Sequence, residues 1–339
     1  MRLPRFKQDF SRRPVLQILS GLVVLSGALA GVLAAPQAWA QAWPAKPVKI
    51  ITAFAAGSAS DIIARLMAQE LQAEYGQTFV VDNKPGASGF IAAEFLTKSA
   101  PDGYTLMLTT NTVNSANPHL FKKLPYDPIK DFTPIARICN ATFLLAVAAE
   151  NPAKSVADLV AAAKANPGKA NFAYGNSTGQ IAGAAFNNLA GLGATAVPYK
   201  STPQALTGLV GGEVMFLFVD FASSQALLKG GRIRALAVTT ESRSSLAPDI
   251  PSLASSANLP GFDLAAWVGI VGPAGMPADV VGKLSTSITR IVARKEITER
   301  LTSLGTDVSP GNSAELQAYM GQQLISWRDK IKAAGIQPE

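Results

Sequence analysis

The chain has 339 residues, of which 48% are hydrophobic and 16% charged, so it is unlike a disordered protein and long enough for two lobes with buried cores. Its single cysteine (Cys139) and single histidine (His119) exclude a disulfide framework, a cysteine-based zinc site and chemistry that needs two histidines. The net charge is +7, but residues 1–40 contain five basic residues and one acidic residue. The remainder has 25 basic and 22 acidic residues, a balance too even for a nucleic-acid-binding surface.

The first 40 residues have the pattern of an export signal. Basic residues end at Arg13, an uncharged apolar run covers residues 14–35, and Ala38-Trp39-Ala40 fits an A-x-A cleavage site. We expect residues 1–40 to be a signal peptide, cut after Ala40, and the mature chain to be periplasmic. The alternative is an uncleaved anchor, because the apolar run could span the ~30 Å bilayer core. The segment 11–17 also resembles a twin-arginine motif, so the export route stays open between that pathway and Sec.

The first part of the mature chain alternates strand and helix patterns. We expect strands over 48–54, 79–82 and 104–109, and helices over 62–75 and 91–98. Strands separated by helices predict parallel βαβ units. A loop region rich in asparagine and proline is expected between residues 110 and 142, before an apolar strand over 143–148.

The alternation then begins again and predicts a second unit. The expected elements are a helix over 156–168 capped by Ser155, a strand over 170–174, a helix over 180–191, a strand over 194–199, a helix over 203–209, strands over 214–219, 233–239 and 267–272, and helices over 277–294 and 313–334. We expect the chain to cross between the units near 143–149 and 265–272. Residues 41–145 and 265–339 would form lobe 1, residues 146–264 would form lobe 2, and the two crossing strands would act as a hinge.

Two loops, 55–61 and 175–180, follow a strand and open a helix. Their small residues leave backbone N–H groups accessible at a helix N-terminus, where the helix dipole favours an anion. Ligands of open α/β sheets bind at such carboxyl ends of strands. The alternative is two ordinary turns, in which Ser60 or Asp61 and Ser177 or Thr178 would cap the helices. Neither loop fits a P-loop or a dinucleotide-binding fingerprint.

The expected site is a binding site with no catalytic residue, metal or cofactor. The candidate ligand contacts are Phe54, Ala55, Ala56, Gly57 and Ser58 in the first loop, Asn176, Ser177, Thr178 and Gly179 in the second, and Lys200 and Asp220 at two further strand ends. Asp220 could contact a ligand amine or cap the next helix, and Lys200 could pair with an anion or be solvated. We expect His119 to have a loop or packing role and Cys139 to be a small buried residue.

Several segments, read together and in order, resemble one family. They are Trp43-Pro44-Ala45-Lys46-Pro47, Gly76-Gln77 with VVDNKPGASG, Pro101-Asp102-Gly103-Tyr104-Thr105-Leu106, Leu124-Pro125-Tyr126-Asp127-Pro128 with Asp131-Phe132, Val197-Pro198-Tyr199-Lys200, Arg234-Ala235-Leu236-Ala237-Val238-Thr239, Pro248-Asp249-Ile250-Pro251-Ser252 and Ala334-Gly335-Ile336. The mature chain resembles the Bug-type, or tripartite tricarboxylate transporter, periplasmic substrate-binding proteins.

The resemblance implies an α/β fold of the two-lobed, type II-like "Venus flytrap" kind, each lobe a parallel-rich sheet flanked by helices. It implies a cleft for a dicarboxylate, tricarboxylate or aromatic carboxylate, and delivery to integral membrane permease subunits by a protein that we expect to be a monomer. The family's first loop usually reads Pro-Phe-Pro-Pro-Gly-Gly before an Asp. Here the stretch is Ala53-Phe54-Ala55-Ala56-Gly57-Ser58, with Asp61 retained, and Gln180 replaces the histidine that usually follows the second loop.

Two other functions remain open on sequence grounds. A receptor that presents its ligand to a membrane sensor kinase would have the same features as a transport receptor. An exported α/β hydrolase acting on a carboxylate ester is less favoured, because the chain lacks a second histidine and a G-x-S-x-G nucleophile elbow.

Overall fold

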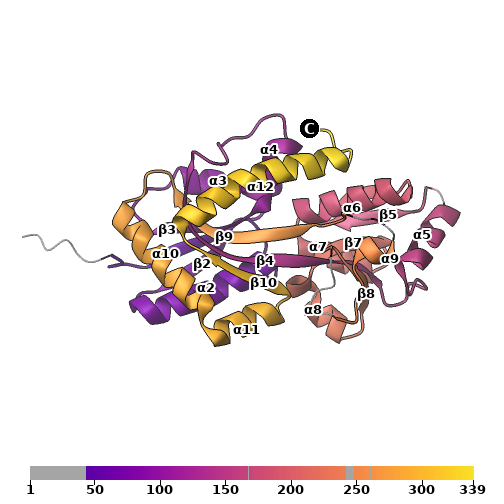
Figure 1. The fold of residues 1–339 in the computed structure, drawn as a ribbon, viewed down its shortest axis with the longest axis horizontal. Coiled ribbons are helices and arrows are strands. Elements are labelled where there is room, and N and C mark those ends of the chain that lie inside the picture. Colours follow the sequence, from indigo (N-terminus) through magenta and orange to yellow (C-terminus); the bar gives the residue numbers. More distant parts are fainter. Residues whose placement is uncertain (1–42, 167, 242–247, 258, 260) are drawn as a thin grey trace, which may run out of the picture. The chain divides into compact units, whose positions relative to one another are not determined.

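The computed structural model describes residues 43–339 except 167, 242–247, 258 and 260 (Figure 1). The predicted signal peptide and its cleavage site lie outside the described residues and stay predictions. The strands are β1 (Val48–Thr52), β2 (Phe79–Asn83), β3 (Thr105–Thr110), β4 (Phe132–Ala148), β5 (Asn171–Tyr174), β6 (Thr195–Pro198), β7 (Phe216–Asp220), β8 (Ile233–Val238), β9 (Ala265–Pro273) and β10 (Thr306–Gly311).

Most helices follow a strand directly or after a short loop. The α-helices are α2 (Ala59–Tyr75), α3 (Phe90–Thr97), α4 (Asn117–Leu120), α5 (Val156–Ala165), α6 (Ser177–Ala190), α7 (Thr202–Val210), α8 (Phe221–Lys229), α9 (Leu253–Ser256), α10 (Ala278–Ala293), α11 (Lys295–Ser303) and α12 (Ser313–Ala333). A 3₁₀ turn, η1 (Ala87–Gly89), and a π-helix, η2 (Thr112–Ala116), complete the described elements.

The strands pair in the order β2-β1-β3-β9-β4-β7-β5-β6, with β10 and β8 also paired to β4. Residues 132–142 of β4 pair with β9, and residues 143–148 pair with β7 and β8. We call the pairings of β2, β1, β3, β9, β10 and the first part of β4 the first sheet, and those of β7, β5, β6, β8 and the second part of β4 the second sheet. Figure 1 shows β4 and β9 side by side through the centre. The lobe boundaries expected above stay predictions.

Each sheet combines parallel and antiparallel pairs. β1 is parallel to β2 and β3, and β5 is parallel to β6 and β7, as the βαβ pattern predicts. β4 and β9 run antiparallel to their neighbours. The expected α/β fold with helices flanking the sheets is confirmed. The expectation of parallel-rich sheets is wrong: among the described strands, the first sheet has two parallel and three antiparallel pairings and the second has two of each, because β4 pairs antiparallel with all of its neighbours and β9 with β3.

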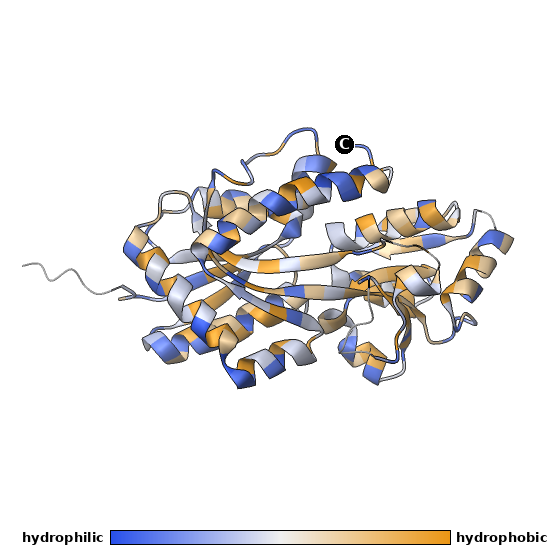
Figure 2. Cartoon of the chain, in the orientation of Figure 1, coloured by the Kyte–Doolittle hydropathy of each residue, from blue (hydrophilic) through white to orange (hydrophobic). Residues whose placement is uncertain are grey.

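Both faces of each sheet are covered by apolar helix faces. On the first sheet, Ile50 packs with α2, α10 and α11, whereas its neighbour Ile51 packs with α3 and α12, because successive strand residues face opposite sides. On the second sheet, α5, α6 and α9 cover one face and α7 and α8 the other. Figure 2 shows the central strands largely in the hydrophobic colour and the outer helix surfaces in mixed colours.

The helix N-caps differ from those expected. Ser58, rather than Ser60 or Asp61, caps α2 by accepting the Asp61 N–H, and Asn176, rather than Ser177 or Thr178, caps α6 by accepting the Gly179 N–H. Both true caps stand in extended backbone just before their helix, as N-cap geometry requires. The predicted Ser155 cap of α5 is confirmed and forms a full capping box with Asp158.

Candidate ligand-binding site

Two adjoining cavities lie between the first and second sheets. The inner cavity, of about 30 Å³, is lined by Phe54 and Ser58 of the first loop, by Asn111 after β3, and by second-sheet residues that include Thr178 and Asp220. The outer cavity, of about 690 Å³, adjoins it, since both are lined by Phe54, Thr112 and Asn176. A volume of roughly 300–1,000 Å³ is usual for a small-molecule pocket.

Four helices begin at the inner cavity. Ser58, Asn176 and Asp220 are the N-caps of α2, α6 and α8, Thr202 is the first residue of α7, and all four residues line the cavity. Each helix N-terminus carries a partial positive charge of about +0.5 and unpaired backbone N–H groups. The starts of α2, α6 and α7, whose lining residues Ser58, Asn176 and Thr202 are uncharged, favour a small anion without an arginine or lysine in the cavity wall, whereas the Asp220 carboxyl offsets the partial charge of α8.

The first loop is held in place by the carboxylate of Asp61. This carboxylate accepts hydrogen bonds from the Gly57 N–H (3.1 Å) and from Asn83 Nδ2 (2.9 Å), and it pairs with Arg65 at 2.9 Å. Burial alone raises the pKa of the Asp61 carboxyl, but the hydrogen bonds from Arg65, Gly57 and Asn83 outweigh burial and hold that pKa below its usual value. The ionised Asp61 therefore fixes the loop that contains Phe54 and Ser58.

The second loop is held by Asn176. Its Oδ1 accepts the Gly179 N–H at 2.9 Å, and its Nδ2 donates to Thr202 Oγ1 at 3.1 Å. One side chain thereby ties the start of α6 to the start of α7. Gly175 allows the close approach of these two loops, since a Cβ at this position would lie 2.3 Å from the Ser201 carbonyl carbon.

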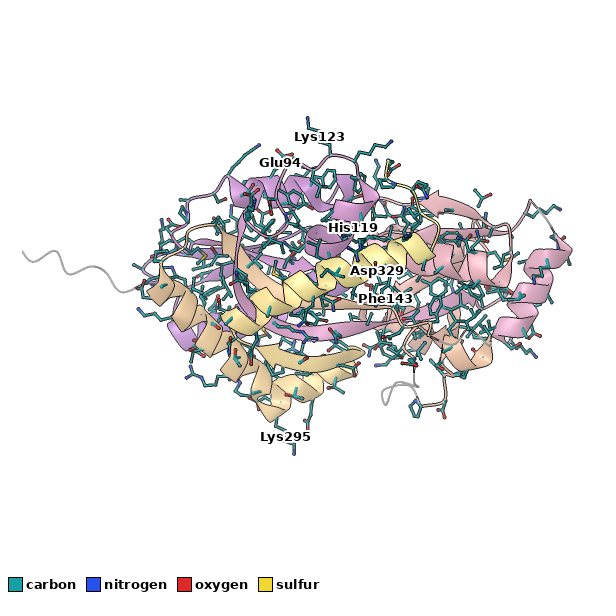
Figure 3. All side chains as sticks on the ribbon, turned by 45° about the horizontal axis from the view of Figure 1, so that its top comes forward. Glu94, His119, Lys123, Phe143, Lys295 and Asp329 are labelled. Atoms are coloured by element: carbon teal, nitrogen blue, oxygen red, sulfur yellow. The ribbon has the colours of Figure 1, made fainter. Side chains whose placement is uncertain are left out.

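Side chains of the first sheet bond directly to those of the second. Asn111 Nδ2 donates to Thr178 Oγ1 at 2.9 Å, and the hydroxyls of Thr112 and Ser177 lie 2.7 Å apart. Phe143, labelled in Figure 3, lies on β4 where the strand passes from the first sheet to the second, and it lines the inner cavity. The inner cavity is small and is lined by residues of both sheets.

Asp220 is buried at the end of β7, with 4% of its surface exposed. Its Oδ1 accepts the Ser223 N–H at 2.7 Å, and the Ser223 hydroxyl also bonds to the carboxyl group. Burial raises the pKa of Asp220, and the hydrogen bonds from Ser223 only partly oppose this effect. Of the two roles considered for Asp220, the capping of the next helix is present in the structure, and the carboxyl also faces the cavity.

The candidate residues divide into three groups. Phe54, Ser58, Asn176, Thr178 and Asp220 line the inner cavity, and Phe54, Ala55, Asn176, Ser177 and Lys200 line the outer one. Ala56, Gly57 and Gly179 line neither. The N–H groups of Gly57 and Gly179 are occupied by Asp61 and Asn176, so in this structure they hold the loops in place.

The expectation of a loop over 110–120 is wrong. The expected ligand contacts therefore do not include Asn111 and Thr112, which line the inner cavity. Residues 112–116 form the π-helix η2 and residues 117–120 form α4, at the carboxyl end of β3. Asn111, Asn114 and Asn117 are fully buried there. A π-helix is rare and frequent at functional sites. The available signal was the polar run Thr109-Thr110-Asn111-Thr112 directly after an apolar strand.

Other reactive groups lie apart from the cavities. His119 on α4 hydrogen-bonds through Nε2 to the Leu324 carbonyl (2.9 Å), and Figure 3 shows it beside Asp329 of α12. Cys139 is buried, and burial raises the pKa of its thiol to about 12. Among the described residues, no three His, Cys, Asp or Glu side chains cluster as metal ligands do, and no helix there is long and apolar enough to cross a membrane.

Comparisons with known proteins identify the family of this chain. The model of the tripartite tricarboxylate transporter family receptor matches residues 63–336. A UPF0065 protein of Bordetella bronchiseptica is 34% identical over 312 residues, which are 90% of this chain and 91% of the relative.

Solved structures show the same fold. A protein of R. palustris with adipate is 33% identical, with a TM-score of 0.85 over 88% of this chain and all (100%) of the other. The periplasmic binding protein BugD is 30% identical, with a TM-score of 0.83 over 88% of this chain and 100% of BugD. MatC from Rhodopseudomonas palustris with bound malate is 29% identical, with a TM-score of 0.79 over 85% of this chain and 100% of MatC. The chain belongs to the tripartite tricarboxylate transporter receptor family, the Bug-type periplasmic solute-binding proteins.

Proposed function

We propose that the protein is a monomeric periplasmic receptor that captures a small organic acid between its two sheets and delivers it to the permease of a tripartite tricarboxylate-type transporter. The observation that carries the proposal is the convergence of four helix N-termini on one cavity wall. Relatives hold adipate and malate, which are both dicarboxylates. One ligand carboxylate lies at the helix N-termini, and the rest of the ligand extends into the outer cavity.

The available interactions are strong enough for such binding without a metal. A hydrogen bond to a charged group contributes about 1.5–3 kcal/mol. Four such bonds contribute roughly 6–12 kcal/mol before the costs of ordering, and micromolar binding needs about 8.2 kcal/mol. In the outer cavity, the exposed Lys200 is placed to meet a second, distal carboxylate.

The proposal is tested by a thermal-shift screen of organic acids with uncharged amides of the same length as controls. A ligand at 100 times its dissociation constant is expected to stabilise the protein by about 2.7 kcal/mol. For a chain of this size, that stabilisation raises Tm by several degrees. The amides should give no shift, because the helix N-termini select for negative charge. A screen in which no carboxylate raises Tm above its amide control contradicts the proposal.

The sensor-receptor alternative uses the same site and differs only in the partner. Permease genes beside this gene would favour uptake, and sensor-kinase genes would favour signalling. For the hydrolase alternative, Ser58 and Ser60 line the inner cavity, but the chain's only histidine bonds to Leu324 and lines neither cavity. Hydrolysis of a carboxylate ester by the purified protein would support the hydrolase alternative.

We further propose export to the periplasm with cleavage after Ala40, on the basis of the A-x-A pattern and the uncharged run before it. N-terminal sequencing of protein released from the periplasm is expected to begin at Gln41. Recovery of the intact chain in the inner membrane fraction would instead support the uncleaved anchor.

A further inference from the structure

The inner cavity contains acceptors as well as helix N-termini. Asn111 is fully buried, and while its Nδ2 donates to Thr178, its Oδ1 has no hydrogen-bond partner. The Asp220 carboxyl is bonded only to its own helix start at Ser223, and no lysine or arginine of the described residues pairs with it. A buried acceptor without a donor, as at Asn111 Oδ1, and a buried carboxyl without a cation, as at Asp220, are both costly, so a complete site needs a group that donates hydrogen bonds to them.

The size of the cavity limits that group. About 30 Å³ is room for one or two groups the size of a water molecule. A hydroxyl or an ammonium has that size and donates hydrogen bonds, whereas an unsubstituted methylene fills the space without satisfying either acceptor. The carboxylate that the helix N-termini attract lies at the same cavity, so donor and carboxylate must be close neighbours in the ligand.

We propose that Asp220 and Asn111 select ligands with a hydroxyl or ammonium on the carbon beside the carboxylate, that is, 2-hydroxy or 2-amino acids. The inference rests on the proposed function and narrows its substrate class. Ser58, Asn176 and Thr202 receive the carboxylate at the starts of α2, α6 and α7, and Asp220 at the start of α8 receives the donor. The two acceptors thereby act as specificity-determining residues.

The first test compares three four-carbon acids by isothermal titration calorimetry with the wild-type protein. Succinate, malate and aspartate have the same carbon chain and two carboxylates, and they differ in carrying hydrogen, hydroxyl or ammonium at position 2. We expect malate or aspartate to bind about 10- to 100-fold more tightly than succinate. Preference for malate identifies the donor as hydroxyl, and preference for aspartate identifies it as ammonium.

The second test uses Asp220→Asn, with Asp158→Asn as the matched control. Asn is as good an N-cap as Asp, so α8 is expected to stay capped while the second carboxyl oxygen becomes an NH₂ donor. The preference for malate or aspartate over succinate should fall below about 3-fold, and the affinity for succinate should rise. Asp158 is exposed at the start of α5 and lines neither cavity, so its substitution should leave all three affinities unchanged.

The possible results distinguish failure of the donor requirement from failure of the proposed function. Equal binding of the three acids, tighter binding of succinate, or binding of only unsubstituted acids such as adipate overturns the donor requirement and leaves the proposed function standing. An unchanged preference in folded Asp220→Asn overturns the role of Asp220. If no organic acid binds at all, the proposed function fails and the inference fails with it. Should the variant not fold, the wild-type series alone decides.

Discussion

Replacement of Thr178 by Asp is expected to reduce the affinity for the best organic acid by at least about 100-fold. Thr178 is buried in the first turn of α6, lines the inner cavity and accepts the hydrogen bond from Asn111. A carboxylate there occupies the position of the ligand's anion and repels it. Two like charges about 4 Å apart cost about 4 kcal/mol at an effective dielectric constant of 20. Calorimetry on the purified variant measures the loss.

The fold of the Thr178→Asp variant is expected to survive, because a negative charge is favourable in the first turn of a helix and Asn176 remains the N-cap. The control is Thr207→Asp on α7, which adds the same charge at an exposed position that lines neither cavity. Undiminished affinity in a correctly folded Thr178→Asp variant would exclude the 175–180 segment from the pocket.

The strands and helices with strong apolar patterns were predictable from the sequence. β1, β3, β5 and β7 are short runs of apolar and β-branched residues, and α2 and α6 each end at a left-handed glycine, Gly76 and Gly191. The first half of β4 falls in the region where the sequence predicts a loop, and Pro134, Arg137 and Asn140 interrupt its apolar pattern. In the structure, the β4–β9 pairing shifts register after Pro134 and after Arg137, whereas Asn140 pairs regularly with Trp267. Tertiary pairing with β9 outweighs the weak local preference.

Some elements in the last part of the chain also have a weak local sequence pattern. The sequence pattern does not predict the short helix α11 or the strand β10, and it gives no bounds for the helix after Asp220, which is α8. α11 buries only Ile297 and Leu301, and β10 contains Pro310 and ends at Gly311, so neither has a strong pattern of its own. Each is stabilised by packing on neighbours that the local sequence does not reveal.

The site was partly predictable for a physical reason. Loops at the carboxyl ends of parallel strands gather at one edge of a sheet, so the first and second loops could be selected from their positions alone. Asn111 and Thr112 also follow a parallel strand, but the sequence does not reveal their contacts, because their partners Thr178 and Ser177 stand 67 and 65 residues further along the chain. The roles of Gly57 and Gly179 are also not evident from the sequence, because their N–H groups reach the acceptors Asp61 and Asn176 only in the folded loops.

Substitution of Gly175 by Ala is expected to destabilise the protein by about 1–3 kcal/mol and to weaken ligand binding. A Cβ at Gly175 would lie 2.3–2.5 Å from backbone atoms of Ser201 and Thr202, which have no side-chain freedom to move aside. The second loop and the start of α7 would have to separate by roughly 1 Å in a close-packed region. Both segments line the cavities, so the displacement also moves Asn176 away from Thr202. Denaturant unfolding and calorimetry measure the two effects.

Gly282→Ala is the matched control, since Gly282 lies within α10, where an added Cβ meets nothing within 4 Å. Alanine favours a helix interior over glycine by about 1 kcal/mol, so this variant should be more stable than the wild type and bind the ligand equally well. Gly175→Ala should lower the free energy of unfolding and Gly282→Ala should raise it. This difference distinguishes steric conflict at Gly175 from the general effect of replacing a glycine. Stability and affinity of Gly175→Ala equal to those of the wild type would mean that the two loops do not approach each other as closely as described.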